Sequence, residues 1–394
     1  MAELPRIAYF MQCAWGWAWQ RPHVAAIELA RGFEVDVYVP ADKGEQMVSN
    51  PVPDSLKLLP YIDQRIFFRD RVPEFIGTYD VAWFCGPAGF SHAREKFPAG
   101  IRVVYDYMDD TLLYAHILAR PVTYARLWLD EIALVERSDL LFASSGTLAQ
   151  RLVDRYQPSS PAIVVNNAAP VSGSAAAPRQ TAHHGLNITY VGTVASWFDF
   201  PTVLQALDAV PEAVCHLVGP LHVTPPAHPR LKPLGPQTHA RALELMQEAD
   251  LLVMPRVVDS LTETINPVKL YEYIQTGIPV VAVAFGESRR FAEFVYLYEN
   301  PLEFTAFVRS AAAKSLAPKG SRDAVAEFLR DNSWEKRGIA WRNGVSEVLS
   351  RTISRPAMPH LAYQRKQLSR IVGHMEKLSQ RGSMRARVGR PGKR

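Results

Sequence analysis

The sequence lacks the segments and motifs that mark several common classes of protein. Its longest apolar run, Ile278–Phe285, is far shorter than the roughly 20 residues needed to span a bilayer. Near residue 1 there is no long apolar region followed by small residues, so we expect no signal peptide and a cytoplasmic protein. The absence of Gly-x-Ser-x-Gly and of a Gly-Lys-Ser/Thr phosphate loop argues against the common serine hydrolase and P-loop classes.

Cysteine is scarce, and positive charge is concentrated at one end of the chain. Cys13, Cys85 and Cys215 lie far apart without metal-type spacing, so we expect reduced structural thiols and no zinc site. Residues 351–394 carry twelve lysines and arginines and one acid, a net charge of +11, while the remaining residues carry −6. The basic balance therefore belongs to the tail, and we expect the globular body not to bind nucleic acid.

Short apolar runs alternate with helical patterns in both halves of the chain. The predicted strands are 7–10, 35–39, 81–85, 103–107, 140–143 and 163–165, then 188–192, 214–218, 251–254, 279–284 and 295–298. Such alternation is typical of parallel sheets covered by helices on both faces. Ligands of these sheets bind beyond the carboxyl ends of the strands, so a cleft between two domains is the expected site.

We therefore predict an α/β fold of two Rossmann-like domains that face each other across a cleft. The predicted parts are a first domain 1–167, a linker 168–186 rich in Ala, Pro and Ser, a second domain 187–332, a crossover helix 333–352 and a basic tail 353–394. Ser333 is the expected N-cap of the crossover helix. Within the tail we predict a helix over 360–380 and disorder from residue 381 onward.

The run Thr264–Ala282 has the pattern of a helix followed by a buried strand. Asn266 is the predicted N-cap, Pro267 the first helical residue and Gly277 the residue just past the helix end. The free N–H groups at such a helix start can bind a phosphate.

Two charged residues follow that helix start. Lys269 lies in the first turn, where a cation is mildly unfavourable because it opposes the helix dipole. A bound diphosphate would reverse that penalty. Glu272 lies about 7.5 Å beyond Pro267 at 1.5 Å per residue, a distance suited to the ribose of the same nucleotide. The alternative is an ordinary ion pair between Lys269 and Glu272 on a solvated helix face.

Two further segments carry chemically informative side chains. The first is the Trp-rich run Trp-Gly-Trp-Ala-Trp-Gln-Arg-Pro-His-Val over 15–24, which follows a strand and opens a helix. Its three tryptophans either shape a binding surface or serve as ordinary apolar cover. The second is Asp106-Tyr-Met-Asp-Asp at the end of a strand. Asp109 or Asp110 is expected to face a substrate as hydrogen-bond acceptor or base, the alternatives being a metal ligand or a helix N-cap.

These segments resemble bacterial GT-B glycosyltransferases related to retaining family 4, in the subgroup of polysaccharide and teichuronic-acid-type biosynthesis. The resemblance rests on Asn-Pro-Val-Lys-Leu-Tyr-Glu-Tyr-Ile-Gln-Thr-Gly-Ile-Pro over 266–279 and on the Trp-rich run that ends in Gln-Arg-Pro-His. Two departures from the family stand out. The first of the family's two donor-site glutamates falls on Thr264, and Thr193 stands where an arginine is usual, after Gly192.

The resemblance implies a role for each matching residue. The residues implied to bind the nucleotide-sugar donor are Arg21, Gly192, Thr193, Gly219, Arg256, Thr264, Asn266, Lys269 and Glu272. Among these, Glu272 would hold the ribose, while Arg256 and Lys269 would replace the missing family cations. The residues implied to face the acceptor are Trp15, Trp17, Gln20, His23 and His116. His116 has a packed or surface histidine as its alternative.

The function expected from the resemblance is sugar transfer from a nucleotide-sugar to a saccharide or lipid-linked acceptor, with retention and without a metal or other cofactor. The basic tail is expected to contact an anionic membrane at its cytoplasmic face, unless it serves only solubility. Three alternatives remain. They are a sugar-nucleotide epimerase on the same fold, a non-catalytic scaffold favoured by the departures at Thr193 and Thr264, and a nucleic-acid binder that rests on the tail alone.

Overall fold

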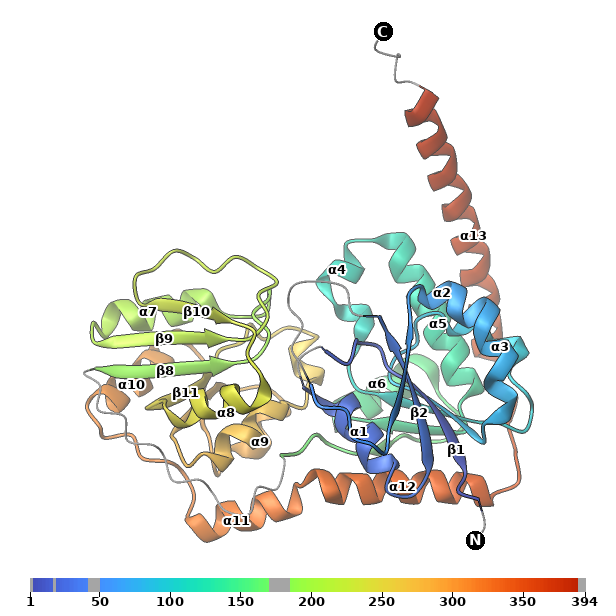
Figure 1. Cartoon of the computed structure of the whole chain (residues 1–394). Coiled ribbons are helices and arrows are strands. Elements are labelled where there is room, and N and C mark those ends of the chain that lie inside the picture. Colours follow the sequence, from blue (N-terminus) through green and yellow to red (C-terminus); the bar gives the residue numbers. More distant parts are fainter. Residues whose placement is uncertain (1–2, 17–18, 42–49, 170–184, 389–394) are drawn as a thin grey trace.

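The computed structural model describes residues 3–16, 19–41, 50–169 and 185–388, and Figure 1 shows two sheets with helices around them. The strands of the first sheet are β1 (Arg6–Phe10), β2 (Glu34–Pro40), β3 (Lys57–Tyr61), β4 (Val81–Phe84), β5 (Arg102–Tyr107), β6 (Leu140–Ala143) and β7 (Ile163–Val164). They lie in the order β3-β2-β1-β4-β5-β6-β7, and every neighbouring pair is parallel. The chain order reverses between β1 and β4, where such sheets bind ligands.

The second sheet repeats this plan. Its strands are β8 (Leu186–Val191), β9 (Ala213–Val218), β10 (Leu231–Gly235), β11 (Leu251–Met254), β12 (Val280–Val283) and β13 (Tyr296–Tyr298). They are parallel in the order β10-β9-β8-β11-β12-β13, with the reversal between β8 and β11. Residues that follow strands of both sheets meet between the two halves. The predicted double-Rossmann architecture is confirmed.

Every strand predicted from the sequence has a counterpart in these sheets, but β3 and β10 were not predicted. Both lie at sheet edges, contain a proline, and are largely exposed, with Tyr61 and Leu231 as their buried residues. Edge strands tolerate proline because one side of their backbone needs no partner. They therefore lack the continuous apolar run that marks the central strands.

The helices fall into short and long elements around the sheets. They are α1 (Arg21–Leu29), α2 (Gln64–Ile66), α3 (Val72–Phe75), α4 (Ala115–Leu118), α5 (Pro121–Arg137), α6 (Gly146–Tyr156), α7 (Phe200–Ala209), α8 (His239–Gln247), α9 (Val268–Gln275), α10 (Pro301–Ala312), α11 (Arg322–Asp331), α12 (Trp334–Ser350) and α13 (Pro359–Val388). In the first half, α1 and α12 share one apolar core, and α5, α6 and α13 share the core on the other sheet face. A separate core surrounds the second sheet.

Helix α12 returns the chain from the second half to the first. Ser333 caps it, since its hydroxyl accepts a hydrogen bond from the Lys336 amide at 3.3 Å, as predicted. The helix packs on α1, and Arg342 forms a 3.0 Å ion pair with Glu28. The two connections between the halves lie side by side, because the amide of Ala169 donates to the Asn332 carbonyl at 3.1 Å. Most of the predicted linker 168–186 lies outside the described residues.

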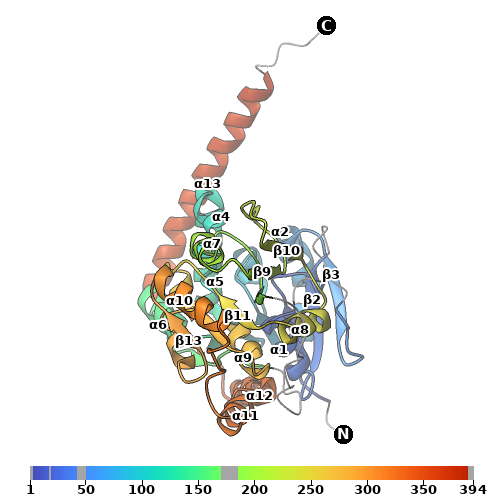
Figure 2. The same ribbon diagram turned by 90° about the vertical axis from the view of Figure 1, so that its left-hand side faces the viewer.

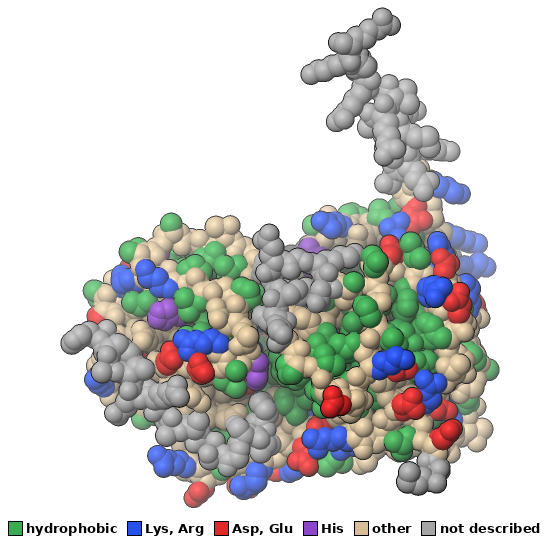
Figure 3. All heavy atoms as spheres, in the orientation of Figure 1, with side chains coloured by type: hydrophobic (Ala, Val, Ile, Leu, Met, Phe, Trp, Pro, Cys, Tyr) green, Lys and Arg blue, Asp and Glu red, His purple; other side chains and the backbone are tan. Residues whose placement is uncertain are grey.

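Helix α13 corrects the expectation of disorder beyond residue 380, because it remains helical to Val388; residues 389–394 are outside the described part. Its first turns pack on α5 through buried Leu361 and Leu368 and through a 2.8 Å bond from Arg365 to Glu136. The remainder projects from the body in both views (Figures 1 and 2). Basic side chains gather on the surface where α13 leaves the body (Figure 3). Among the described residues no helix is both long and apolar enough to cross a membrane.

Gly219, directly after β9, is a point where the fold requires glycine. Its φ is +138°, and a Cβ there would lie 2.2 Å from the carbonyl oxygen of Gly192. We predict that Gly219→Ala lowers the free energy of unfolding by about 2–4 kcal/mol, because the two strand ends must move apart. Chemical denaturation followed by tryptophan fluorescence measures this loss. Gly100→Ala is the control, since a Cβ at Gly100 meets no atom within 4 Å; equal losses in both variants would contradict the prediction.

Candidate functional site

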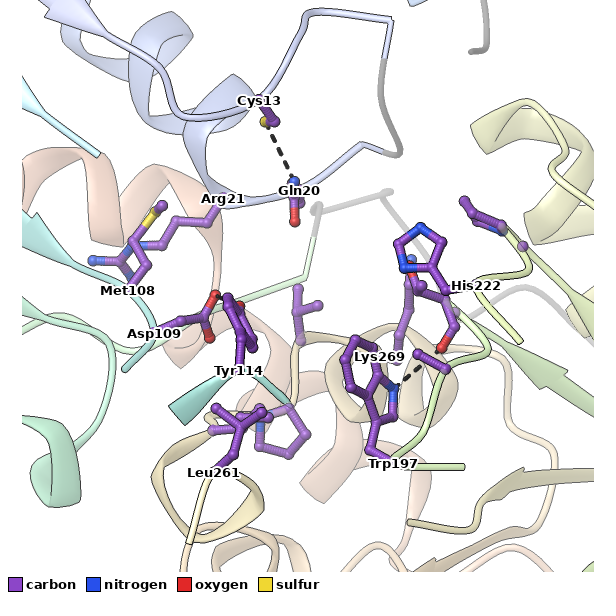
Figure 4. A pocket seen from close by; sticks show the side chains of 18 of the residues that line it. Cys13, Gln20, Arg21, Met108, Asp109, Tyr114, Trp197, His222, Leu261 and Lys269 are labelled. Carbon is purple, nitrogen blue, oxygen red and sulfur yellow. Dashed lines mark hydrogen bonds between the residues drawn. The ribbon is translucent and has the colours of Figure 1, made fainter. Parts of the chain in front are cut away.

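A cavity of about 950 Å³ lies between the carboxyl ends of the two sheets. Segments from both halves line it, and Figure 4 shows Arg21, Met108, Asp109 and Tyr114 on the side opposite Trp197, His222 and Lys269. The first-half lining residues fall within 12–13, 19–22, 86–88 and 108–117, although Asp110 is not among them, together with Gln64, Leu127 and Asn167. The second-half lining residues fall within 190–197, 218–223, 236–242, 254–256 and 265–269, together with Leu261. This volume is in the range of small-molecule sites.

Glycines at two strand ends bring the backbone of the second half up to the cavity. Gly192 follows β8 and Gly219 follows β9, and both line the cavity together with Thr193. The carbonyl of Thr193 accepts hydrogen bonds from the Tyr190 hydroxyl at 2.9 Å and from Trp197 Nε1 at 3.2 Å. The backbone at this wall is therefore held in place while the Cα atoms leave room for a ligand.

Arg256, just beyond β11, supplies an unpaired positive charge to the cavity wall. Its guanidinium lies over the Trp197 ring, 5.3 Å from the centroid, and its Nε has no hydrogen-bond partner. No hydrogen bond or ion pair joins its side chain to any other residue in the described ranges. Burial lowers the pKa of Arg256, partly offset by the nearby Tyr190 and Asp109. A partly buried cation without a partner loses hydration with no compensating charge, so this geometry suits an anionic ligand.

The start of α9 lines the cavity, but its cap differs from the prediction. Pro267 is the N-cap and Val268 the first helical residue, so Asn266 is not the cap. No side chain caps the helix, and Pro267, Val268 and Lys269 border the cavity. At the other end Gly277 has φ +70°, as the prediction of a glycine just past the helix requires.

Asn266 instead ties the second half to the first. Its side-chain oxygen accepts from the Asn167 amide at 2.9 Å, and its nitrogen donates to Glu287 at 2.9 Å. The Asn167 side chain returns a 2.7 Å bond to the Asn266 carbonyl. These hydrogen bonds occupy the Asn266 side chain. The residue is only 2% exposed, although it borders the cavity.

Lys269 and Glu272 form the ion pair considered as an alternative, with Nζ 2.8 Å from Oε2. The pair does not lie on a solvated face, since the Glu272 side chain is only 4% exposed. Lys269 borders the cavity and Glu272 does not. Glu272 thus holds the Lys269 ammonium at the wall rather than reaching into the space itself.

Arg21 lies at the back of the first-half wall. Its Nε and Nη2 donate to Asp106 at 2.9 and 2.6 Å, and both side chains are almost fully buried. It also donates to the Val165 carbonyl and lies 4.9 Å from the Trp341 ring centroid. Arg21 borders the cavity, but its charge is already compensated by Asp106.

The two acids considered as substrate-facing groups have different surroundings. Asp109 borders the cavity and accepts a 3.1 Å hydrogen bond from Tyr114. Burial raises the pKa of Asp109 to about 6, against the lowering effects of Tyr114, Arg256 and Arg21. Asp110 points away, is fully buried, and is bound by Arg151 at 3.0 Å and Arg155 at 2.6 Å. The substrate-facing expectation for Asp110 is therefore corrected to a structural ion cluster.

The Trp-rich segment contributes differently from the prediction. Trp15 is 5% exposed in the core, where its Nε1 donates to the Pro51 carbonyl, and Trp17 lies outside the described residues. His23 is fully buried between Trp15 and Gln20, and burial lowers its pKa. These placements correct the acceptor-facing expectation for Trp15 and His23.

Trp19, which was not among the predicted site residues, borders the cavity instead, as do Gln20 and His116. Trp19 stacks on the buried His23 ring with 5.0 Å between centroids, so the histidine supports it from behind. The His116 ring is 5.8 Å from that of Tyr114. The sequence has three tryptophans at alternate positions, and this pattern could not indicate that Trp19 rather than Trp15 borders the cavity.

Thr264 does not border the cavity. It lies in a 3-10 turn, is fully buried, and its hydroxyl donates to the Leu261 carbonyl at 2.7 Å. Its donor-binding role is thus not supported by its position. In the described part of the chain no group of three or more His, Cys, Asp or Glu side chains is arranged to hold a metal ion.

Comparison with solved structures shows which fold the chain has. No protein-family model and no curated protein sequence matches the chain. Among solved structures, Anabaena Alr3699/HepE in complex with UDP-glucose superposes with a TM-score of 0.65 at 16% identity over 87% of this chain and 99% of that chain. The E. coli trehalose-6-phosphate structure bound with UDP-2-fluoro glucose gives 0.60 at 11% over 88% and 99%. Sucrose-phosphate synthase from Thermosynechococcus elongatus gives 0.54 at 15% over 94% and 100%. The fold is that of the GT-B glycosyltransferases.

The contrast between the two aspartates gives opposite predictions for stability. The raised pKa means that ionised Asp109 costs folding free energy above about pH 6, a cost that is absent below its ordinary pKa of 3.8. Asp109→Asn should therefore stabilise the protein by about 1–3 kcal/mol at pH 7.5 and lose this advantage near pH 4. Asp110→Asn should destabilise by about 2–4 kcal/mol, because it leaves Arg151 and Arg155 without their partner. Denaturant titrations at both pH values measure this, and a stability loss in Asp109→Asn at pH 7.5 would contradict the assignment.

Proposed function

We propose that this protein is a glycosyltransferase that moves a sugar from a nucleotide-sugar donor to a saccharide or lipid-linked acceptor. The observation that carries the proposal is the unpaired guanidinium of Arg256, which lies in the same cavity wall as Lys269 and the uncapped start of α9. Together they form a site for a diphosphate. The likeness to structures bound with UDP-glucose and UDP-2-fluoro glucose supports a nucleotide-sugar as the ligand and UDP as the first probe.

In this proposal the second half holds the donor. The diphosphate lies between Arg256, Lys269 and the N–H groups of α9, and it approaches the backbone at Gly192 and Thr193. The nucleoside follows along the strand ends near Gly219. Arg256 and Lys269 replace the arginine that is usual in the family at the position of Thr193. This replacement favours a working donor site over the scaffold interpretation.

The same charges explain how transfer proceeds. Negative charge grows on the diphosphate as the bond to the sugar breaks, and preorganised cations in a cavity stabilise that charge strongly. Asp109 on the opposite wall accepts a hydrogen bond from the attacking hydroxyl and orients it. From the resemblance to retaining family 4 we propose retention at the anomeric carbon and no metal or other cofactor.

We propose polysaccharide or glycolipid synthesis as the setting. The basic tail, residues 353–394, suits contact with an anionic membrane, where each lysine or arginine adds about 1 kcal/mol of attraction. An epimerase on the same fold is the rival enzyme. It would convert a nucleotide-sugar without any acceptor, so a product that contains both sugars distinguishes the two.

The donor site predicts nucleotide-dependent stabilisation. At 100 times its dissociation constant, the nucleotide that binds among UDP, GDP, ADP and their sugar conjugates should add about 2.7 kcal/mol. A thermal-shift screen detects this increase. Arg256→Ala and Lys269→Ala should each abolish it, because each removes a charge from the diphosphate site.

Arg309→Ala is the matched control for that screen. Arg309 is an exposed arginine on α10 that does not border the cavity, so its loss should leave the shift intact. Absence of a shift with every nucleotide would contradict the proposal and favour the scaffold. A shift that persists in Arg256→Ala and Lys269→Ala would place the nucleotide elsewhere.

A further inference from the structure

The two walls of the cavity differ in charge. The second half contributes the cations Arg256 and Lys269, whereas the first half contributes the carboxylate of Asp109. Among the described first-half lining residues the single arginine or lysine is Arg21, and Asp106 already neutralises it. The described part of the first-half wall therefore offers no free arginine or lysine to an anion.

Three glutamine side chains contribute to the polar surface of this first-half wall. Gln12 and Gln64 border the cavity, and their side-chain amides make no hydrogen bond with any residue in the described ranges. Gln20 directs its nitrogen to Cys13 at 3.4 Å and its oxygen toward the cavity (Figure 4). Each amide offers both donors and an acceptor, which matches the hydroxyl groups of a sugar.

An aromatic surface completes the wall. The Trp19 ring borders the cavity and is fixed by its stack on His23, and Tyr114 lies beside Asp109. A flat aromatic ring supported from behind is suited to the apolar face of a pyranose ring, while the amides serve its rim.

We propose that the acceptor of this enzyme is an uncharged sugar, bound through the amides of Gln12, Gln20 and Gln64 and the Trp19 ring, and not a sugar phosphate. This inference rests on the proposed glycosyl transfer and specifies its second substrate. A phosphate monoester carries −1.5 to −2 charges at pH 7 and binds through arginine or lysine. On this wall it would meet Asp109 instead, whose carboxylate repels it once ionised.

Saturation-transfer NMR on the protein saturated with UDP tests the inference. The probes are the methyl glycosides of glucose, galactose and mannose and the 6-phosphates of the same three sugars. At least one methyl glycoside should bind saturably, and each 6-phosphate should bind at least tenfold more weakly than the corresponding glycoside that binds. Gln12→Ala with Gln64→Ala should weaken glycoside binding about tenfold without changing UDP affinity. Gln150→Ala, an exposed glutamine on α6, is the matched control.

A charge-introducing variant sharpens the result. Gln64→Lys should improve binding of the 6-phosphates, because it places a cation on a wall whose described lining residues include no unpaired arginine or lysine. Equal or tighter binding of any 6-phosphate by the unmodified protein would overturn the inference, as would the absence of glycoside binding while UDP still binds. Failure to bind any nucleotide would instead contradict the proposed function, so the two outcomes are distinguishable.

Discussion

The unpaired guanidinium of Arg256, partly buried in the cavity wall, is the constraint on which the account of this site depends. A cation held in a cavity wall without a partner destabilises the empty protein unless an anion arrives to share its charge. The guanidinium stays unpaired because Trp197 covers one of its faces and Asp109 lies within electrostatic range without forming an ion pair. Lys269 differs, because Glu272 holds it at the wall. The site thus combines one unpaired cation with one that is held ready by a buried carboxylate.

The fold provides this arrangement by joining two parallel sheets at their carboxyl ends. One polar connection joins the two halves, and a second, buried one holds a helix of the first half on its sheet. The Asn167–Asn266 pair links the end of the first sheet to the start of α9, and the Arg21–Asp106 pair fixes α1 to β5 beneath Trp341 of α12. Neither pair needs a ligand. The Asn167–Asn266 pair helps to set the distance between the donor wall and the acceptor wall, and the Arg21–Asp106 pair fixes the start of α1 within the acceptor wall.

The sequence could predict the architecture because central parallel strands are continuous apolar runs, as in 81–84 and 251–254. It could not predict β3 and β10, whose exposure at sheet edges removes that pattern. Within the site, the resemblance implied Gly192 and Gly219, while Lys269 was predicted from its place at a helix start, and all three border the cavity. Asp109 and Asp110 are adjacent acids whose roles depend on which way each side chain points, and only Arg151 and Arg155, distant in sequence, decide this. The same holds for Asn266, whose partner Asn167 belongs to the other half.

Hydrogen exchange measured by mass spectrometry with and without UDP tests the central claim most directly, because it locates the nucleotide along the chain. The account predicts slower exchange in 190–197 and 254–270, where Gly192, Arg256 and the start of α9 surround the diphosphate. It predicts little change in α13 and in the ion cluster around Asp110. Protection confined to the first half, or none outside α13, would contradict the claim that the unpaired cation of the second half is a diphosphate site.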